Sequence, residues 1–123
     1  MLLSLAVQTP DVPIRIPVAL LDGDLGEILS KVSRQGYDGV ELITTDPASL
    51  DRTSIKKLLT EHHLKVSAIA SGGMAFAAKL TLLNPDPNVV SLARQRLDEM
   101  IDLASDLGAA VVTVGSFRGR AVG

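Results

Sequence analysis

Hydrophobic residues along the chain gather in short runs, separated by longer segments in which they recur at wider spacing. The runs cover residues 2–7 (LLSLAV), 40–43 (VELI), 64–70 (LKVSAIA) and 110–114 (AVVTV). Runs of this length, bounded by Pro, Gly, Asp or Ser, are typical of strands that are buried on both faces of a sheet. The pattern therefore predicts four strands.

The segments between these runs predict three amphipathic helices, because their hydrophobic residues lie three and four positions apart. A candidate N-cap precedes each helix, namely Asp24, Asp51 and Asp86. Glycine follows the first and third helices, at Gly36 and Gly108, where a left-handed residue commonly ends a helix. The inner face of the third helix is predicted to contain Val90, Ala93, Leu97, Met100, Ile101 and Ala104.

The resulting order, βαβαβαβ, requires a parallel sheet whose strands are joined by helical crossovers. No linker divides the chain, so we expect a single domain over residues 1–123. Two architectures have this order: an open doubly wound sheet, and the first half of an eight-stranded (β/α) barrel. The turn after the first strand, Gln8-Thr9-Pro10-Asp11, lacks the glycines of a dinucleotide-binding sheet. The hydrophobic pattern alone does not distinguish further between the open sheet and the half-barrel.

Composition narrows the classes of partner. The chain has 123 residues, of which 46% are hydrophobic, and a formal net charge of -2, so nothing indicates a surface for nucleic acid or an anionic membrane. It contains no cysteine, which excludes disulfides and thiolate zinc sites. The apolar start lacks a basic region and a small-residue cleavage site, so we interpret it as a strand and expect a cytoplasmic protein.

Several segments, in order, resemble one known family: GYDGVEL, HHLKVSAIASGG, LLNPDPN, IDLASDLGAAVVTVGS and FRGR. Together they are similar to the sugar phosphate isomerase/epimerase family with the xylose-isomerase-like TIM barrel, whose superfamily also contains DNA-repair enzymes of the endonuclease IV type. The resemblance runs from Ser4 to Arg120. Members are barrels of roughly 250 or more residues. The resemblance thus implies the first half of a TIM (β/α)8 barrel with four parallel strands, and a fragment of a larger enzyme.

The resemblance also implies an activity. It would be an isomerase or epimerase of a sugar, sugar phosphate or sugar acid, moving a proton beside a carbonyl with a divalent metal, manganese or magnesium. In the related enzymes later strands supply the metal ligands, so most would lie outside this chain, and the isolated chain is expected to be inactive. One alternative is a non-catalytic half-barrel that pairs with itself or a partner through its open edges. Abasic-site repair is less favoured, because no predicted strand end carries a histidine for zinc.

Glu41 is the predicted catalytic residue. A carboxylate within an apolar strand is costly to bury unless it is paired, and barrel enzymes place their chemistry at the carboxyl ends of strands. It could bind a substrate hydroxyl or transfer a proton, whereas a structural ion pair is the alternative. Strand alternation predicts that Glu41 and Ile43 face the barrel interior while Val40 and Leu42 face the helices.

Other polar residues near the predicted strand ends are candidates for binding the sugar: Gln8, Ser71, Gly72, Ser116, Arg118 and Arg120. Arginine forks suit phosphate or carboxylate oxygens, although a solvated loop explains Arg118 and Arg120 equally well. His62 and His63 point about 100° apart on a helix, so we interpret them as a C-terminal cap and not as metal ligands. The acidic residues of the third helix, such as Asp98 and Asp102, fit a solvated outer face.

Overall fold

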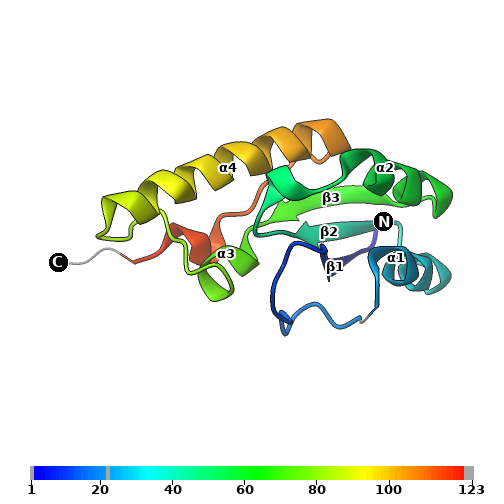
Figure 1. The fold of residues 1–123 in the computed structure, drawn as a ribbon. Helices are drawn as coiled ribbons and strands as arrows, with labels where there is room; N and C mark the ends of the chain where they lie inside the picture. Colours follow the sequence, from blue (N-terminus) through cyan, green and yellow to red (C-terminus); the bar gives the residue numbers. More distant parts are fainter. Residues whose placement is uncertain (1, 22, 121–123) are drawn as a thin grey trace.

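The fold was obtained as a computed structural model, which describes residues 2–21 and 23–120 (Figure 1). Within these residues, three strands alternate with helices, and there are two short 3-10 helices: η1 between β2 and α2, and η2 after α4. The elements in chain order are β1 (Ser4–Gln8), α1 (Leu25–Arg34), β2 (Gly39–Ile43), η1 (Pro47–Ser49), α2 (Arg52–Glu61), β3 (Lys65–Ala70), α3 (Gly72–Phe76), α4 (Pro87–Leu107) and η2 (Gly115–Arg118).

The strands form a parallel sheet in the order β1-β2-β3. Ser4 lies opposite Gly39 and Gln8 lies opposite Ile43, so β1 and β2 are paired along their whole length. Sequential strands are therefore neighbours, as is usual for strands that are joined by helical crossovers. This confirms the predicted strand order as far as β3.

The predicted fourth strand is reduced to a single bridge, between Val112 and Ile69. Ile69 N donates to Val111 O, and Thr113 N donates to Ile69 O, both at 3.0 Å. Two residues after Ile69, the Ser71 hydroxyl donates to Thr113 O at 2.5 Å. A side-chain hydrogen bond therefore stands where a continued strand would have a backbone hydrogen bond. The chain then turns into η2. Residues 111–113 thus occupy the place of a fourth strand, but their pairing is too short to form one.

The helices begin and end close to where the sequence predicts. Each predicted N-cap carboxylate accepts a backbone hydrogen bond: Asp24 from Glu27 N, Asp51 from Ser54 N and Asp86 from Asn88 N. Gly36 and Gly108 have positive φ angles of 87° and 75°, a conformation that glycine adopts without steric cost. Local sequence alone is sufficient for these boundaries.

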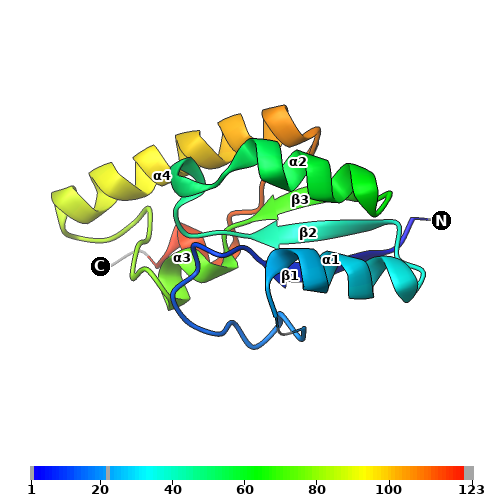
Figure 2. The same cartoon turned by 45° about the vertical axis from the view of Figure 1, so that its right-hand side comes forward.

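The two faces of the sheet are covered differently. One buried cluster joins Val40 and Leu42 of β2 to hydrophobic residues of α1, α2 and α4, so these three helices share one side of the sheet. Figure 2 shows them alongside the strands, with α3 near the strands' carboxyl ends. On the opposite, inner face, Ile43 packs in a smaller cluster with Val12 and Ile16 of the β1–α1 loop. The predicted division of β2 between the two faces is confirmed.

Two details of the helices differ from the prediction. Ile101, predicted on the inner face of α4, is 52% exposed, whereas Leu103 is fully buried. Leucine, isoleucine and alanine lie on several sides of this 21-residue helix, so spacing alone did not select the buried stripe. The long loop after β3 contains the short helix α3, which has too few residues to show a period.

A β-bulge interrupts the pairing of β2 and β3. Val40 lies opposite Val66, but Glu41 lies opposite Ala68, so Ser67 is the extra residue of β3. Ser67 donates from its hydroxyl to Val40 O at 3.2 Å. The bulge allows Val66 and Ile69, three positions apart, to join the same helix-side cluster.

Candidate functional site

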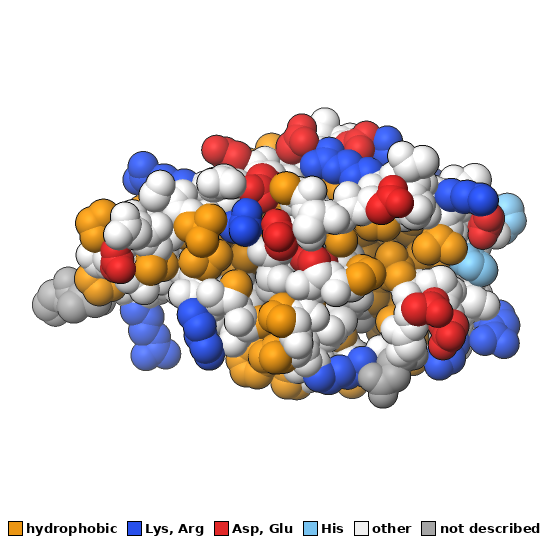
Figure 3. Space-filling model, viewed as in Figure 1, with side chains coloured by type: hydrophobic (Ala, Val, Ile, Leu, Met, Phe, Trp, Pro, Cys, Tyr) orange, Lys and Arg blue, Asp and Glu red, His pale blue; other side chains and the backbone are white. Residues whose placement is uncertain are grey.

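The candidate site lies at the carboxyl end of the sheet, where barrel enzymes place their chemistry. The loops that follow β1, β2 and β3 meet at this end, together with α3 and η2 (Figure 1). Figure 3 shows Lys and Arg side chains projecting at the left of the molecule, the side on which Figure 1 places α3 and η2.

Glu41 occupies the inner face of the sheet, two residues before the carboxyl end of β2. Its neighbours in register are Ala6 of β1 and Ala68 of β3, whose small side chains leave room beside the carboxylate. The residue is half-buried. Within the described part of the chain, its carboxylate forms no hydrogen bond or ion pair. The structural ion pair considered for Glu41 is therefore absent from these residues, whereas its catalytic role stays a prediction.

Gln8 and Ser71 are engaged in holding the chain together. The Gln8 amide donates from Nε2 to Ile14 O at 3.1 Å, and its Oε1 accepts from Ile16 N at 2.8 Å, which fixes the β1–α1 loop. Ser71 is buried, and its hydroxyl and backbone N–H both bond to Thr113. The structure thus gives both residues a positioning role at the sheet end, and sugar binding by them stays a prediction.

Gly72, Ser116, Arg118 and Arg120 are exposed around the same end of the molecule. Gly72 begins α3, and an added Cβ there would meet no atom within 4 Å. The two arginine side chains have no partner among residues 2–21 and 23–120. The glycine between them has a φ of +81°, and its backbone approaches Thr81 closely. Ser116, Arg118 and Arg120 are close in sequence and Gly72 lies more than 40 residues before them, but α3 and η2 are neighbours in the fold; together they form no built binding site.

Asp11 connects the loops after β1 and β2, a role that the sequence analysis missed. One carboxylate oxygen, Oδ2, accepts from Thr44 Oγ1 at 2.6 Å, from Thr45 N at 2.8 Å and from Asp46 N at 2.6 Å. The other oxygen accepts from the Thr9 hydroxyl. The available signal was an acidic residue immediately after the strand-ending Thr9-Pro10, although the three partners of its Oδ2 atom are more than 30 residues away.

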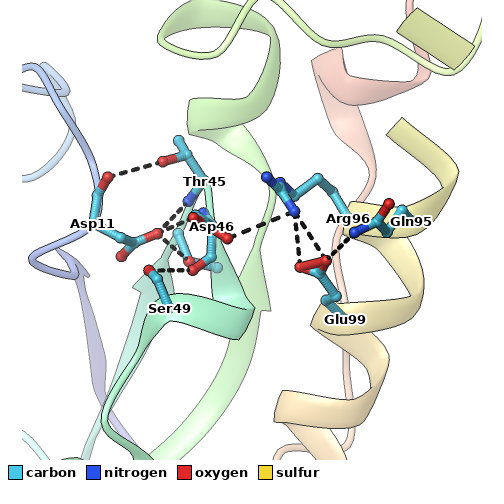
Figure 4. A network of polar contacts seen from close by, with 8 residues as sticks. Asp11, Thr45, Asp46, Ser49, Gln95, Arg96 and Glu99 are labelled. Carbon is cyan, nitrogen blue, oxygen red and sulfur yellow. Dashed lines mark hydrogen bonds and ion pairs between the residues drawn. The ribbon is translucent and has the colours of Figure 1, made fainter. Parts of the chain in front are cut away.

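The same network continues to α4 (Figure 4). Arg96 lies 3.6 Å from the Asp46 carboxylate and 2.9 Å from the Glu99 carboxylate. The arginine side chain is 19% exposed, so the ion pair is partly shielded from water. The long helix is thereby held against the loop after β2, and Asp11 fixes the other side of that loop.

The histidines lie away from this end, as predicted. His62 is the C-cap of α2, and His63 follows with a φ of 54°. The His62 carbonyl accepts a hydrogen bond from the Ser33 hydroxyl at 2.9 Å. Both histidines therefore close a helix at the amino end of β3, which confirms the capping interpretation.

The described residues do not form a metal centre. No group of three or more His, Asp or Glu side chains among them lies close enough to hold an ion. Glu41 is a single carboxylate with alanines beside it. A divalent metal thus does not fit these residues alone.

A family model described as the xylose isomerase-like TIM barrel matches residues 29–122. The chain belongs to this family. Membership decides between the two architectures that the hydrophobic pattern left open, in favour of the barrel. The described part of the chain contains no helix long and apolar enough to cross a membrane.

Relatives agree with this assignment. A ketose 3-epimerase from Arthrobacter globiformis is 35% identical over 81 residues, which cover 66% of this chain and 27% of that protein. The chain therefore spans much less than the whole length of this relative. The 81 matched residues correspond to 27% of that protein.

Two solved structures share the fold. The D-allulose 3-epimerase from Methylomonas sp., in complex with D-allulose, superposes with a TM-score of 0.61 at 19% identity, over 89% of this chain and 35% of that one. An AP endonuclease of family 2 from Brucella melitensis gives a TM-score of 0.59 at 18% identity, over 91% of this chain and 40% of that one. At such identity the likeness shows the fold alone, a partial TIM barrel.

Proposed function

We propose that this xylose isomerase-like chain contributes the first half of the active site of a sugar epimerase or isomerase that acts on keto sugars. The observation that carries the proposal is the position of Glu41. Of the three strands that the structure describes, it is the sole carboxylate, it faces inward, and it lies close to the carboxyl end. The relationship to a ketose 3-epimerase supports a keto sugar as the substrate class.

The proposed reaction is proton transfer beside a carbonyl. A base removes the proton from the carbon next to the carbonyl, which leaves an enediolate. In an epimerase, the proton then returns to the opposite face of the same carbon, so the atoms and charge balance. An inward carboxylate without a partner is suited to accept a hydrogen bond from a substrate hydroxyl, or to accept such a proton. Glu41 would bind and orient the sugar at this position, while Asp11 holds the neighbouring loops in place.

The chain alone lacks a set of metal ligands among its described residues, so the proposal does not assign turnover to it. A divalent metal, manganese or magnesium, would be held by residues from elsewhere in a complete barrel. A cytoplasmic location likewise stays an expectation from the sequence.

The proposal is tested with a chimaera in which this chain replaces the matching segment of the A. globiformis ketose 3-epimerase. Epimerisation of ketohexoses by the chimaera is measured beside two amide variants, Glu41→Gln and Asp98→Asn. Glu41→Gln should lower kcat about 100-fold or more, the contribution expected of a positioned acid or base, with an unchanged melting temperature. Asp98 is exposed on α4, so Asp98→Asn should leave kcat unchanged.

Two results would contradict the proposal. One is a folded Glu41→Gln chimaera with the activity of the parent. The other is a chimaera that folds and contains every residue of the relative's remaining barrel, yet converts no keto sugar.

A further inference from the structure

Glu41 lies between two alanines in the sheet. Its partners in register are Ala6 on β1 and Ala68 on β3. These are the two strands that pair with β2, so the structure describes the neighbours of Glu41 on both sides. Paired strands lie about 4.8 Å apart, and side chains in register point to the same face. A single methyl group therefore flanks the carboxylate-bearing side chain on each side.

Both alanines lie on the inner face of the sheet. Ala6 packs against the inner cluster that contains Ala70, whereas the next residue, Val7, belongs to the helix-side cluster. On β3, Ile69 belongs to the helix-side cluster and Ala70 to the inner one. Because successive side chains of a strand alternate between its faces, Ala68 shares the inner face with Ala70. The inner surface beside Glu41 is thus small-chained on both neighbouring strands.

The bulge at Ser67 brings Ala68 to this position. Pairing of the two strands is regular up to Val40, and Ala68 lies opposite Glu41 immediately after the bulge. Without the extra residue, Ser67 would lie opposite Glu41, and Ile69 would face inward two residues later. Instead, Ile69 is fully buried on the helix side. Bulges often re-aim side chains next to active sites, and this one keeps a large side chain off the inner face.

We propose that Ala68 and Ala6 are specificity-determining residues, which leave room beside Glu41 for the carbon chain of a keto sugar. This inference rests on the proposed function, because it concerns the same site. Replacement of either alanine by valine adds two methyl groups next to Glu41, in the space that the sugar would use. Neither alanine side chain titrates or forms hydrogen bonds, so the substitution should weaken sugar binding and leave the proton transfer itself largely unchanged.

The ketose 3-epimerase chimaera tests this inference with D-fructose, a ketohexose, as the substrate. Ala68→Val should raise KM at least about tenfold, the effect expected of extra methyl groups in a binding pocket. Its kcat should change less than about threefold, since the loss falls on binding. Ala48→Val makes the same chemical change at an exposed position in η1 and should change KM less than about twofold.

Ala6→Val provides a second variant, on the opposite side of Glu41. Valine is well suited to strands, and Ala6 is only half-buried, so this variant should fold even if Ala68→Val does not. It should also raise KM at least about tenfold. Thermal unfolding of the full 123-residue chain with each substitution shows which variants retain the fold.

The outcomes separate this inference from the proposed function. An active chimaera whose folded valine variants keep the parent's KM would overturn the inference and leave the proposed function standing. A lower kcat at unchanged KM would overturn it as well, because the alanines would then support only the fold. A folded parent chimaera that converts no keto sugar would contradict the proposed function, and this inference with it.

Discussion

The Asp11 carboxylate accepts a 2.6 Å hydrogen bond from the hydroxyl of Thr44, and this bond joins the loops that follow β1 and β2. Thr44 is completely buried, so its hydroxyl depends on this acceptor. Two backbone N–H groups, from Thr45 and Asp46, bond to the same carboxylate oxygen. The carboxyl end of the inner face is thus organised around one acidic side chain.

Replacement of Asp11 should therefore be costly. Asp11→Ala leaves several donors without an acceptor, and each buried unsatisfied donor costs about 1–3 kcal/mol. We expect the free energy of unfolding to fall by about 2–3 kcal/mol in urea titrations. Asp98→Ala, at an exposed position on α4, should change it by less than about 0.5 kcal/mol. Equal effects of the two substitutions would show that the network contributes nothing to stability.

Two adjacent glycines of α3 should respond differently to alanine. A Cβ on Gly73 would lie 2.9 Å from Thr45 Cγ2, whereas a Cβ on Gly72 would meet nothing within 4 Å. Gly73→Ala should thus lower stability by about 1–3 kcal/mol, the cost of overpacking, while Gly72→Ala should be neutral or slightly stabilising. Thermal unfolding of the pair measures the difference. If both variants have the same melting temperature, Gly73 does not pack closely against Thr45 in the loop that follows β2.

The buried stripe of α4 gives a third matched pair. Leu103 is fully buried and Ile101 is 52% exposed, although they are two residues apart. Leu103→Ala should cost about 2–5 kcal/mol, as for other buried leucines, and Ile101→Ala less than about 0.5 kcal/mol. Chemical denaturation decides between this arrangement and the one predicted from spacing alone, which would give Ile101 the larger effect.

The ion pairs between α2 and α4 should make stability depend on pH. A hydrogen bond from Lys56 lowers the pKa of Asp106 below its ordinary value, and the limited desolvation of this exposed carboxylate opposes the shift only in part. A carboxyl group whose folded-state pKa is lowered stabilises the fold above its unfolded pKa, about 3.9, and loses this contribution as pH falls through the folded value. Asp106→Asn should thus destabilise the chain at neutral pH.

The destabilisation by Asp106→Asn should shrink as the pH is lowered below about 3.9, because the wild-type carboxyl group then becomes neutral as well. Urea titrations of wild type and variant across this range measure the convergence. Asp98→Asn serves as the control, because the wild-type Asp98 carboxylate has no partner in the described regions. A difference that persists unchanged in acid would mean that lost packing, and not charge, explains the Asp106 effect.

Local sequence determined the helix boundaries, the parallel order of the strands and the two faces of β2. Asp24, Asp51 and Asp86 cap their helices through backbone groups two or three residues away, so each cap is a property of a short segment. The alternation of Val40, Glu41, Leu42 and Ile43 likewise follows from the pleat of a strand. Resemblance to a family, and not the hydrophobic pattern, selected the barrel.

Tertiary structure decided the features that depend on residues far apart in the chain. The bulge at Ser67 changes which residues of β3 face the helices, and Thr113 receives its hydrogen bond from Ser71 and not from a continued strand ladder. Asp11 could not be recognised as the centre of a network because its partners, Thr44 to Asp46, approach it only when β1 and β2 pair. Periodicity reports the neighbours of a residue along one element, whereas these contacts arise from how separate elements meet.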